Sequence, residues 1–232
     1  MTSAMEDRQT AQEVAASSEP KPARRKAGGS DKKTPGFRWR GWMGILVLVP
    51  LGVITLLSWP RVREDSWPDL LTDVLAWVAF VAGAGLRIWS SLYLAGRKRR
   101  VVVSEGPYSI CRNPQYLGSF LLAISAALFL KGIVFGAGIG LAFIWYMWAT
   151  VPVEEKYLRG RLGEEYIQYC GRVPRFWPRL SQFRTPEMIE VNVRHFRIEC
   201  TRAAAWIWLP LVCEVLTHLR WETWWPHLFR LP

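Results

Sequence analysis

Long apolar blocks separated by short polar segments occupy most of this 232-residue chain. The first block, residues 42–59, has no charged residue over 18 positions. As a helix it is about 27 Å long, close to the hydrocarbon thickness of a bilayer. Further apolar blocks predict helices over residues 66–96, 115–130 and 133–151. The pattern predicts an all-α, polytopic membrane helix bundle and argues against a soluble globular enzyme.

Local signals place the helix ends. Ser66 followed by Pro68 and Asp69 is typical of a helix start. The pair Lys131-Gly132 leaves room only for a tight helical hairpin. Residues 203–219 are a weaker candidate, because Pro210 and Glu214 interrupt them, and they either span the membrane, re-enter it or lie on its surface. We therefore expect four to five transmembrane helices.

Composition divides the chain into three parts. Residues 1–41 are polar and basic with little to bury, which predicts a disordered tail. Residues 42–180 form the predicted membrane core, and residues 181–232 a helical extension. In the extension, Thr185-Pro186-Glu187 predicts the start of a helix with Arg194, Arg197 and Arg202. Its simplest interpretation is a surface that faces anionic lipid, and the alternative is a lid over a site.

The formal charge of +11 is distributed unevenly between the two ends of the predicted bundle. The tail, residues 96–115 and residues 154–202 carry 24 Lys and Arg in total, whereas the loops on the other side carry 3. The positive-inside rule places the basic side, with the N-terminus, in the cytoplasm. The charge is thus explained by orientation and anionic-lipid contact. No basic helix with interleaved aromatic residues suggests a nucleic-acid partner.

Metal-binding spacing is absent from the sequence. The four cysteines stand far apart, without a CxxC pair, and none of the three histidines lies at helical spacing from another. Structural and catalytic metal sites need clustered ligands, so we expect no metal.

Two polar patches adjoin predicted spans on the basic side. In the first, Asn113 and Pro114 suit the N-cap and first turn of a helix. A helix N-terminus binds carboxylates or phosphates, and Arg112 would add charge there. The alternative is that Asn113-Pro114 only starts the helix and that Arg112 anchors it to headgroups.

The second patch follows Pro152, which should end or kink its span. Glu154 and Glu155 then lie at the bilayer edge, where a carboxylate is costly unless it is paired or functional. The alternative is that they only complement the helix dipole. Because a tight hairpin joins the two spans, we expect both patches to emerge side by side on one face.

An ordered set of short motifs in these patches resembles the isoprenylcysteine carboxyl methyltransferase and phospholipid methyltransferase superfamily. The resemblance covers about residues 77–178 and is specific as a set, not in any single piece. The motifs are Gly106-Pro107-Tyr108, Arg112-Asn113-Pro114-x-Tyr116-x-Gly118, Glu154-Glu155-x-x-Leu158, Leu162-Gly163-x-x-Tyr166-x-x-Tyr169 and Val173-Pro174-Arg175-Phe176-x-Pro178.

The resemblance implies an integral membrane methyltransferase that uses S-adenosylmethionine and holds it in the region 97–178. Methyl transfer from a sulfonium needs positioning and no metal. The resemblance assigns no catalytic base. It implies cofactor contacts from ten residues and offers Arg112, Glu155, Arg87 and Thr150 as supporting or substrate candidates. The ten residues are Arg100, Val101, Val102, Val103, Tyr108, Asn113, Pro114, Gln115, Tyr116 and Glu154.

Two departures from the family pattern bear on the substrate. Isoprenylcysteine methyltransferases usually have His at the position of Asn113, and Arg, for the substrate carboxylate, at the position of Thr150. Asn donates a hydrogen bond but carries no proton charge. The expected acceptor is therefore a lipophilic or small membrane-permeant molecule with a thiol, amine or carboxylate. The alternatives are an NAD(P)H-dependent reductase of the sterol-reductase type and a non-catalytic membrane protein of the same fold.

Overall fold

The computed structural model describes residues 35–97 and 100–229, with side chains from residue 46 onward. The chain divides into two compact units, residues 1–38 and 39–232, and the arrangement described below is that of the second unit. Within the described residues all regular structure is helical, apart from one isolated bridge between Ser58 and Phe229. This confirms the predicted all-α membrane helix bundle.

The long helices follow the apolar blocks closely. Two are compound: α6 continues through a π-helical turn, η1, into α7, and α9 is followed after Ile207 by α10. Short helices α4 and α8 and the 3-10 turn η2 belong to the polar segments. The bounds are α2 Pro35–Leu56, α3 Trp67–Leu94, α4 Pro107–Ile110, α5 Pro114–Phe129, α6 Ile133–Trp145, η1 Tyr146–Thr150, α7 Val151–Leu162, α8 Glu164–Arg172, η2 Leu180–Gln182, α9 Val193–Trp206 and α10 Trp208–Leu219.

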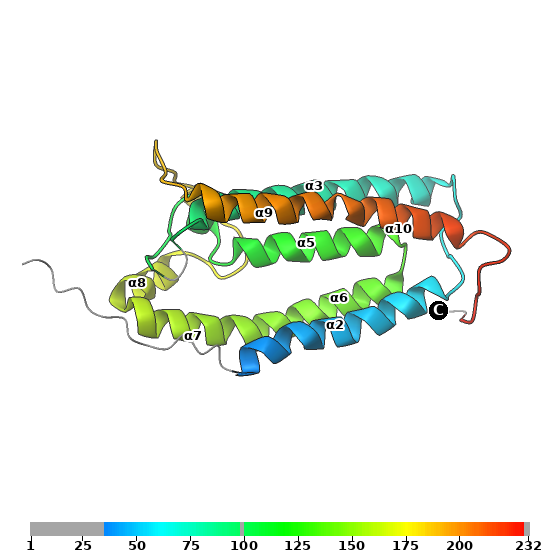
Figure 1. The fold of residues 1–232 in the computed structure, drawn as a ribbon, viewed down its shortest axis with the longest axis horizontal. Helices are drawn as coiled ribbons and strands as arrows, with labels where there is room; N and C mark the ends of the chain where they lie inside the picture. The colour runs from blue at the N-terminus through cyan, green and yellow to red at the C-terminus, as the bar shows by residue number, and fades with distance from the viewer. Residues whose placement is uncertain (1–34, 98–99, 230–232) are drawn as a thin grey trace, which may run out of the picture. The chain divides into compact units, whose positions relative to one another are not determined.

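Helix α5 lies at the centre, with α3, α9 and α10 on one side and α6 on the other (Figure 1). Its tightest contact is with α3, where Gly83 meets Gly118. A Cβ atom on Gly83 would lie 2.9 Å from the carbonyl oxygen of Gly118 and 2.9 Å from the backbone nitrogen of Leu122. Small residues at such crossings let two backbones approach closely. The α3–α5 pair therefore forms the framework on which the site is built.

Three helical stretches among the described residues are long and apolar enough to cross a membrane: Trp67–Leu94, Ile133–Leu162 and Val193–Leu219. Leu46–Leu56 and Pro114–Phe129 are shorter apolar helices. The weak candidate at residues 203–219 is thus the second half of a longer apolar stretch. These helices support an integral membrane protein.

Pro152 does not end its helix, which was one of the two predicted outcomes. The helix continues from Ile133 to Leu162, and the backbone passes into π geometry just before the proline. The Val151 N–H donates to the Tyr146 carbonyl, five residues back. This wider turn shifts the hydrogen-bond register, so the chain accommodates a residue that has no N–H.

The extension helix begins at Val193, not at Thr185. The Asn192 side chain accepts a hydrogen bond from the His195 N–H at 3.2 Å and so caps the helix. The Thr185 hydroxyl instead pairs with the Tyr93 hydroxyl at 2.7 Å. At the other end of the chain, residues 1–34 of the predicted tail lie outside the described residues, and residues 35–41 already belong to α2. The limits at residues 41 and 180 remain predictions.

The predicted hairpin at Lys131-Gly132 is present and is anchored at the end of the bundle opposite α4 and α8. Lys131 pairs with Asp69 and, at 3.2 Å, with Asp73, both near the start of α3. Arg220, 2% exposed, donates to the Leu130 carbonyl at 2.8 Å and to the Ser58 carbonyl at 3.0 Å. These contacts connect the ends of α2, α3, α5 and α10.

Candidate functional site

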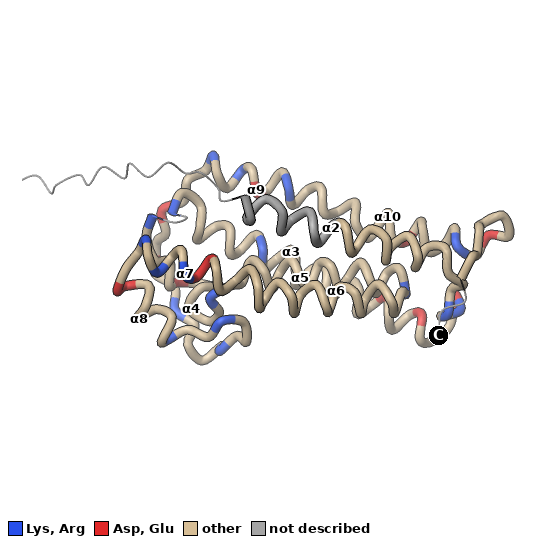
Figure 2. Tube along the Cα trace, turned by 90° about the horizontal axis from the view of Figure 1, so that it is seen from below, with Lys and Arg blue, Asp and Glu red and all other residues tan. Residues whose placement is uncertain are grey.

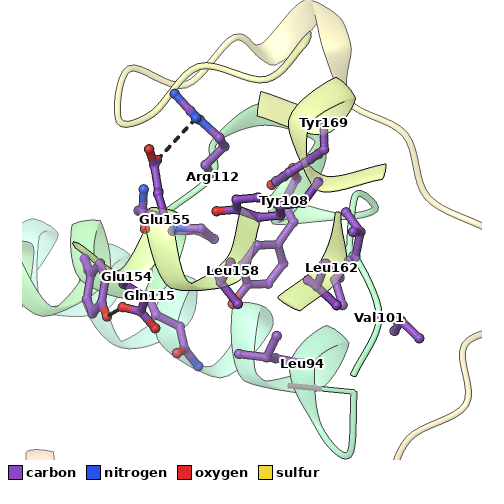
Figure 3. Close-up of a pocket in the computed structure, with 16 residues that line it drawn as sticks. Leu94, Val101, Tyr108, Arg112, Gln115, Glu154, Glu155, Leu158, Leu162 and Tyr169 are labelled. Atoms are coloured by element: carbon purple, nitrogen blue, oxygen red, sulfur yellow. Dashed lines mark hydrogen bonds and ion pairs between the residues drawn. The ribbon is translucent and has the colours of Figure 1, made fainter. Parts of the chain in front are cut away.

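A pocket lies between the N-terminus of α5, the segment 101–103, and helices α4, α7 and α8 (Figure 3). Its empty space is about 750 Å³, counting the part open to solvent. The lining residues are Leu94, Val101, Val102, Val103, Tyr108, Arg112, Asn113, Pro114, Gln115, Tyr116, Glu154, Glu155, Leu158, Leu162, Tyr166 and Tyr169.

Short helix α4, which carries Tyr108, is held from three sides. Gly106 precedes it with a φ of 55°, and a Cβ there would lie 2.4 Å from the ring of Tyr93. Only glycine combines that backbone conformation with that close contact. The Gly106 N–H donates to the Arg184 carbonyl at 2.7 Å, and the Tyr169 hydroxyl donates to the Tyr108 carbonyl at 2.8 Å. Tyr108 is therefore fixed at the pocket wall.

The two patches predicted to converge do meet. The Tyr116 hydroxyl, in the first turn of α5, donates to Oε2 of Glu154 on α7. Gln115 donates from its side chain to the Ser91 hydroxyl of α3 at 3.0 Å. Glu154 and Gln115 lie at one edge of the pocket, with Leu158 and Leu162 farther along α7 (Figure 3). The pocket thus has a polar edge and an apolar wall.

Behind the polar edge, Glu155 is the centre of a buried ion cluster. Its side chain is 4% exposed and lies 3.2 Å from Nη1 of Arg112. Arg175 binds it with two contacts, Nε to Oε1 at 3.2 Å and Nη2 to Oε2 at 2.7 Å. The hydrogen bond with Glu155 raises the pKa of Arg175. Such bidentate pairing fixes the geometry of both partners, so Glu155 positions Arg112 at the pocket.

Arg175 connects this cluster to the segment that follows α8. Its carbonyl accepts a hydrogen bond from the Asn113 side chain at 3.2 Å. The neighbouring Pro174 carbonyl accepts from the Arg112 N–H at 2.9 Å, and the Ile110 carbonyl accepts from the Arg179 N–H at 3.0 Å. Asn113 therefore does not cap α5 with its side chain, although it stands at the cap position.

Burial keeps the hydroxyl groups of Tyr108 and Tyr169 protonated, because it raises the pKa of both. Their hydroxyls are available as hydrogen-bond groups and not as bases at neutral pH. Burial likewise raises the pKa of the Cys111 thiol to about 11.

We expect Cys111 to resist alkylation at pH 8, where about one thiol in a thousand is ionised at that pKa. Cys200, exposed on α9, is expected to react. Maleimide labelling followed by peptide mass spectrometry measures both in one sample. Equal labelling of Cys111 and Cys200 in folded protein would contradict the described packing of α4.

The structure brings together most of the predicted site residues. Nine of the ten expected cofactor contacts line the pocket, as do Arg112 and Glu155. Three candidates do not: Arg100 is exposed outside the lining, Thr150 is buried within η1, and Arg87 faces α9 from α3. A role of these three residues at the site stays a prediction.

Several residues that line the pocket were not predicted from the sequence to contact a ligand. Leu158 and Leu162 follow Glu154 at four-residue spacing, so they share one face of α7. Tyr166 and Tyr169 are buried on α8. The spacing was a usable signal for the leucines. Arg175 lies outside the lining, and no local sequence signal indicated its pairing with Glu155, which lies twenty positions earlier.

Comparisons with known proteins connect this chain with membrane methyltransferases. The sequence model of the phospholipid methyltransferase family matches residues 71–165. Protein-S-isoprenylcysteine O-methyltransferase B of Arabidopsis thaliana is 23% identical over 140 residues, 57% of this chain and 70% of that protein. These matches confirm the resemblance to the isoprenylcysteine and phospholipid methyltransferase superfamily, and they support a membrane methyltransferase.

Two further relatives cover more of the chain. The nickel-cobalt-cadmium resistance protein NccN of Alcaligenes xylosoxydans xylosoxydans is 28% identical over 80% of this chain and 87% of its own length. The cobalt-zinc-cadmium resistance protein CzcN of Cupriavidus metallidurans is also 28% identical, over 80% of this chain and 86% of its length. No solved structure matches. Among the side chains that the structure describes, no three His, Cys, Asp or Glu residues are grouped to hold a metal ion.

Proposed function

We propose that this membrane protein transfers a methyl group from S-adenosylmethionine, held in the pocket, to a lipophilic or small membrane-permeant acceptor. The observation that carries the proposal is the meeting of the α5 N-terminus with Glu154 across one pocket. The family resemblance supports the same location, because the matched residues 71–165 include both segments.

The chemistry of the pocket residues fits S-adenosylmethionine. The ligand carries an amine, a carboxylate, ribose hydroxyls, an adenine ring and a sulfonium. Glu154 suits the amine or a hydroxyl as an acceptor, while the first turn of α5 and Arg112 suit the carboxylate. Leu94, Leu158 and Leu162 give an apolar wall for the ring.

S-adenosylmethionine, when bound, supplies a methyl group on a positively charged sulfur. The chain itself contributes positioning, which accounts for much of the rate when two reactants are held in line. Tyr108 and Tyr116 offer aromatic faces to a cation, an interaction of about 0.5–2 kcal/mol. The buried Glu155 cluster keeps Arg112 in place, and the Tyr116 hydroxyl orients the Glu154 carboxylate.

The proposed acceptor class depends on which residues line the pocket. Thr150 occupies the position at which isoprenylcysteine methyltransferases usually have an Arg, and it does not line the pocket. A prenylcysteine carboxylate therefore loses its expected partner. A lipophilic or small thiol, amine or carboxylate compound that arrives from the membrane remains the proposed acceptor.

We also propose that the pocket faces the cytoplasm. Lys and Arg gather around α4, α7, α8 and the start of α9, with fewer at the opposite end (Figure 2). By the positive-inside rule this charge difference supports a cytoplasmic pocket.

Titration of S-adenosylmethionine into the detergent-purified full-length chain tests the proposal. We expect one binding site by calorimetry. Glu154→Gln is expected to weaken binding at least tenfold, about 1.4 kcal/mol, because the amide removes a negative charge that faces the pocket. Glu165→Gln is the matched control, since Glu165 is exposed on α8 outside the lining, and it should bind like the wild type.

Two results would count against the proposal. Equal affinities of Glu154→Gln and Glu165→Gln would remove the binding site from this pocket. No binding to well-folded wild-type protein would reject the methyltransferase itself. In that case NADPH titration separates the reductase alternative, which predicts binding, from a non-catalytic protein, which predicts none.

A further inference from the structure

A second hollow lies on the membrane-spanning part of the bundle, between α3, α5, α9 and α10. Its empty space is about 980 Å³, counting the part that is open at the surface. Leu122, Ala126, Trp206 and Leu209 give it apolar walls, and Ala123 and Ala205 leave room because they are small. An open groove with such an apolar lining suits a hydrocarbon chain.

One end of the groove is polar, because Arg87 and Ser119 line it there. Arg87 donates from Nη1 to the Ser119 hydroxyl, and its guanidinium lies 4.8 Å from the ring centre of Trp206. Its Nε is buried and has no hydrogen-bond partner among the described residues. A buried donor left without a partner costs about 1–3 kcal/mol, so this end calls for an acceptor from outside the chain.

The charges around Arg87 favour an anion. Its ion pair with Glu199 is long, 3.9 Å between Nη2 and Oε2. Glu199 is shared, because Arg202 Nη1 lies 2.6 Å from its other oxygen. Arg194 and Arg197 lie exposed on the same helix, toward its start. One carboxylate among these arginines leaves a net positive charge.

The depth of Arg87 suits the headgroup region. It lies seven residues before the end of α3 at Leu94, about 10 Å along the helix axis. Helix α3, at 28 residues, is about 42 Å long and exceeds the hydrocarbon thickness. Arg87 is thus near the inner edge of the hydrocarbon layer, within reach of a phosphate by its long side chain.

We propose that this groove binds one anionic phospholipid, with its phosphate at Arg87 and the arginines of α9, and one acyl chain along α5 and α10. The lipid fills the space between α9–α10 and the α3–α5 pair, and so stabilises the extension on the core. This site is separate from the proposed S-adenosylmethionine pocket and does not depend on its function.

Thermal unfolding and native mass spectrometry of the full-length chain test the proposal, with phosphatidylglycerol and phosphatidylcholine of identical acyl chains as probes. We expect phosphatidylglycerol to raise the unfolding midpoint by at least about 3 °C more than phosphatidylcholine does, and one molecule to be retained. Ala205→Trp fills the groove and should remove this difference. Ala204→Trp is the matched control, because Ala204 is the preceding residue, is exposed and does not line the groove. This variant should preserve the difference between the two lipids.

The Arg87→Gln variant distinguishes recognition of the lipid headgroup from binding of the acyl chain. It should abolish the preference for phosphatidylglycerol while general lipid binding persists. Equal stabilisation of the wild type by the two lipids would overturn the proposal, as would an Ala205→Trp variant that behaves like Ala204→Trp. Equal stabilisation by glycerol 3-phosphate would also overturn it, because a free anion would then suffice.

Discussion

Glu155→Gln is expected to lower the free energy of unfolding by about 3 kcal/mol. The buried carboxylate pairs closely with Arg112 and Arg175 and, at 3.9 Å, with Arg159, and removing it leaves these arginines without their shared partner. Breaking a buried ion pair from one side typically costs 3–5 kcal/mol. We take the lower end because the Arg175 side chain is 39% exposed. Reversible unfolding in mixed micelles, followed by Trp fluorescence, measures the change.

The matched control is Glu165→Gln, the same substitution at an exposed position of α8. It should stay within about 0.5 kcal/mol of the wild type. A combined Glu155→Gln, Arg175→Gln variant should lose less stability than the two single variants in sum, because the residues act together. A Glu155→Gln protein as stable as the control would show that the cluster does not hold this end of the molecule.

Gly83→Ala is expected to destabilise the bundle by about 2 kcal/mol. A methyl group there would lie within 3.0 Å of backbone atoms of α5, and two backbones must separate to admit it. Gly85→Ala provides the comparison on the same helix, because a Cβ there meets nothing within 4 Å. It should leave stability unchanged or raise it by up to about 1 kcal/mol.

The same unfolding assay measures the free energy of unfolding of the two glycine variants and so tests the close α3–α5 crossing. If Gly83→Ala and Gly85→Ala were equally stable, the close crossing at Gly83 and Gly118 would be wrong.

The positions of the helices were predictable because burial in a membrane requires long apolar stretches. The start of α3 after Ser66 followed from the sequence pattern with Pro68 in the first turn, although the Ser66 side chain makes no capping hydrogen bond. The hairpin at Lys131-Gly132 followed from the short polar break between two apolar blocks. The convergence of Asn113 with Glu154 also followed from the sequence, since a tight hairpin returns the chain to the same face. The family motifs then indicated nine of the ten expected cofactor contacts that line the pocket, but also Arg100, Arg87 and Thr150, which do not line it.

Other features depend on contacts that no local pattern encodes. A π turn precedes Pro152, and the helix continues through the proline instead of ending there. Thr185 has a good helix-start sequence, yet its hydroxyl pairs with Tyr93, ninety-two positions earlier. The role of Arg175 likewise arises only when the segment after α8 folds against Arg112 and Asn113.

Photochemical labelling tests most directly the central claim, that residues 101–116 and 154–169 form one S-adenosylmethionine pocket. Radiolabelled S-adenosylmethionine is irradiated with the full-length chain, and the modified peptides are identified by mass spectrometry. The predicted result is label on peptides that contain Tyr108 or Tyr116, removed by excess S-adenosylhomocysteine. Label that is removed by the same competitor but confined to α9 and α10, away from these segments, would contradict the account.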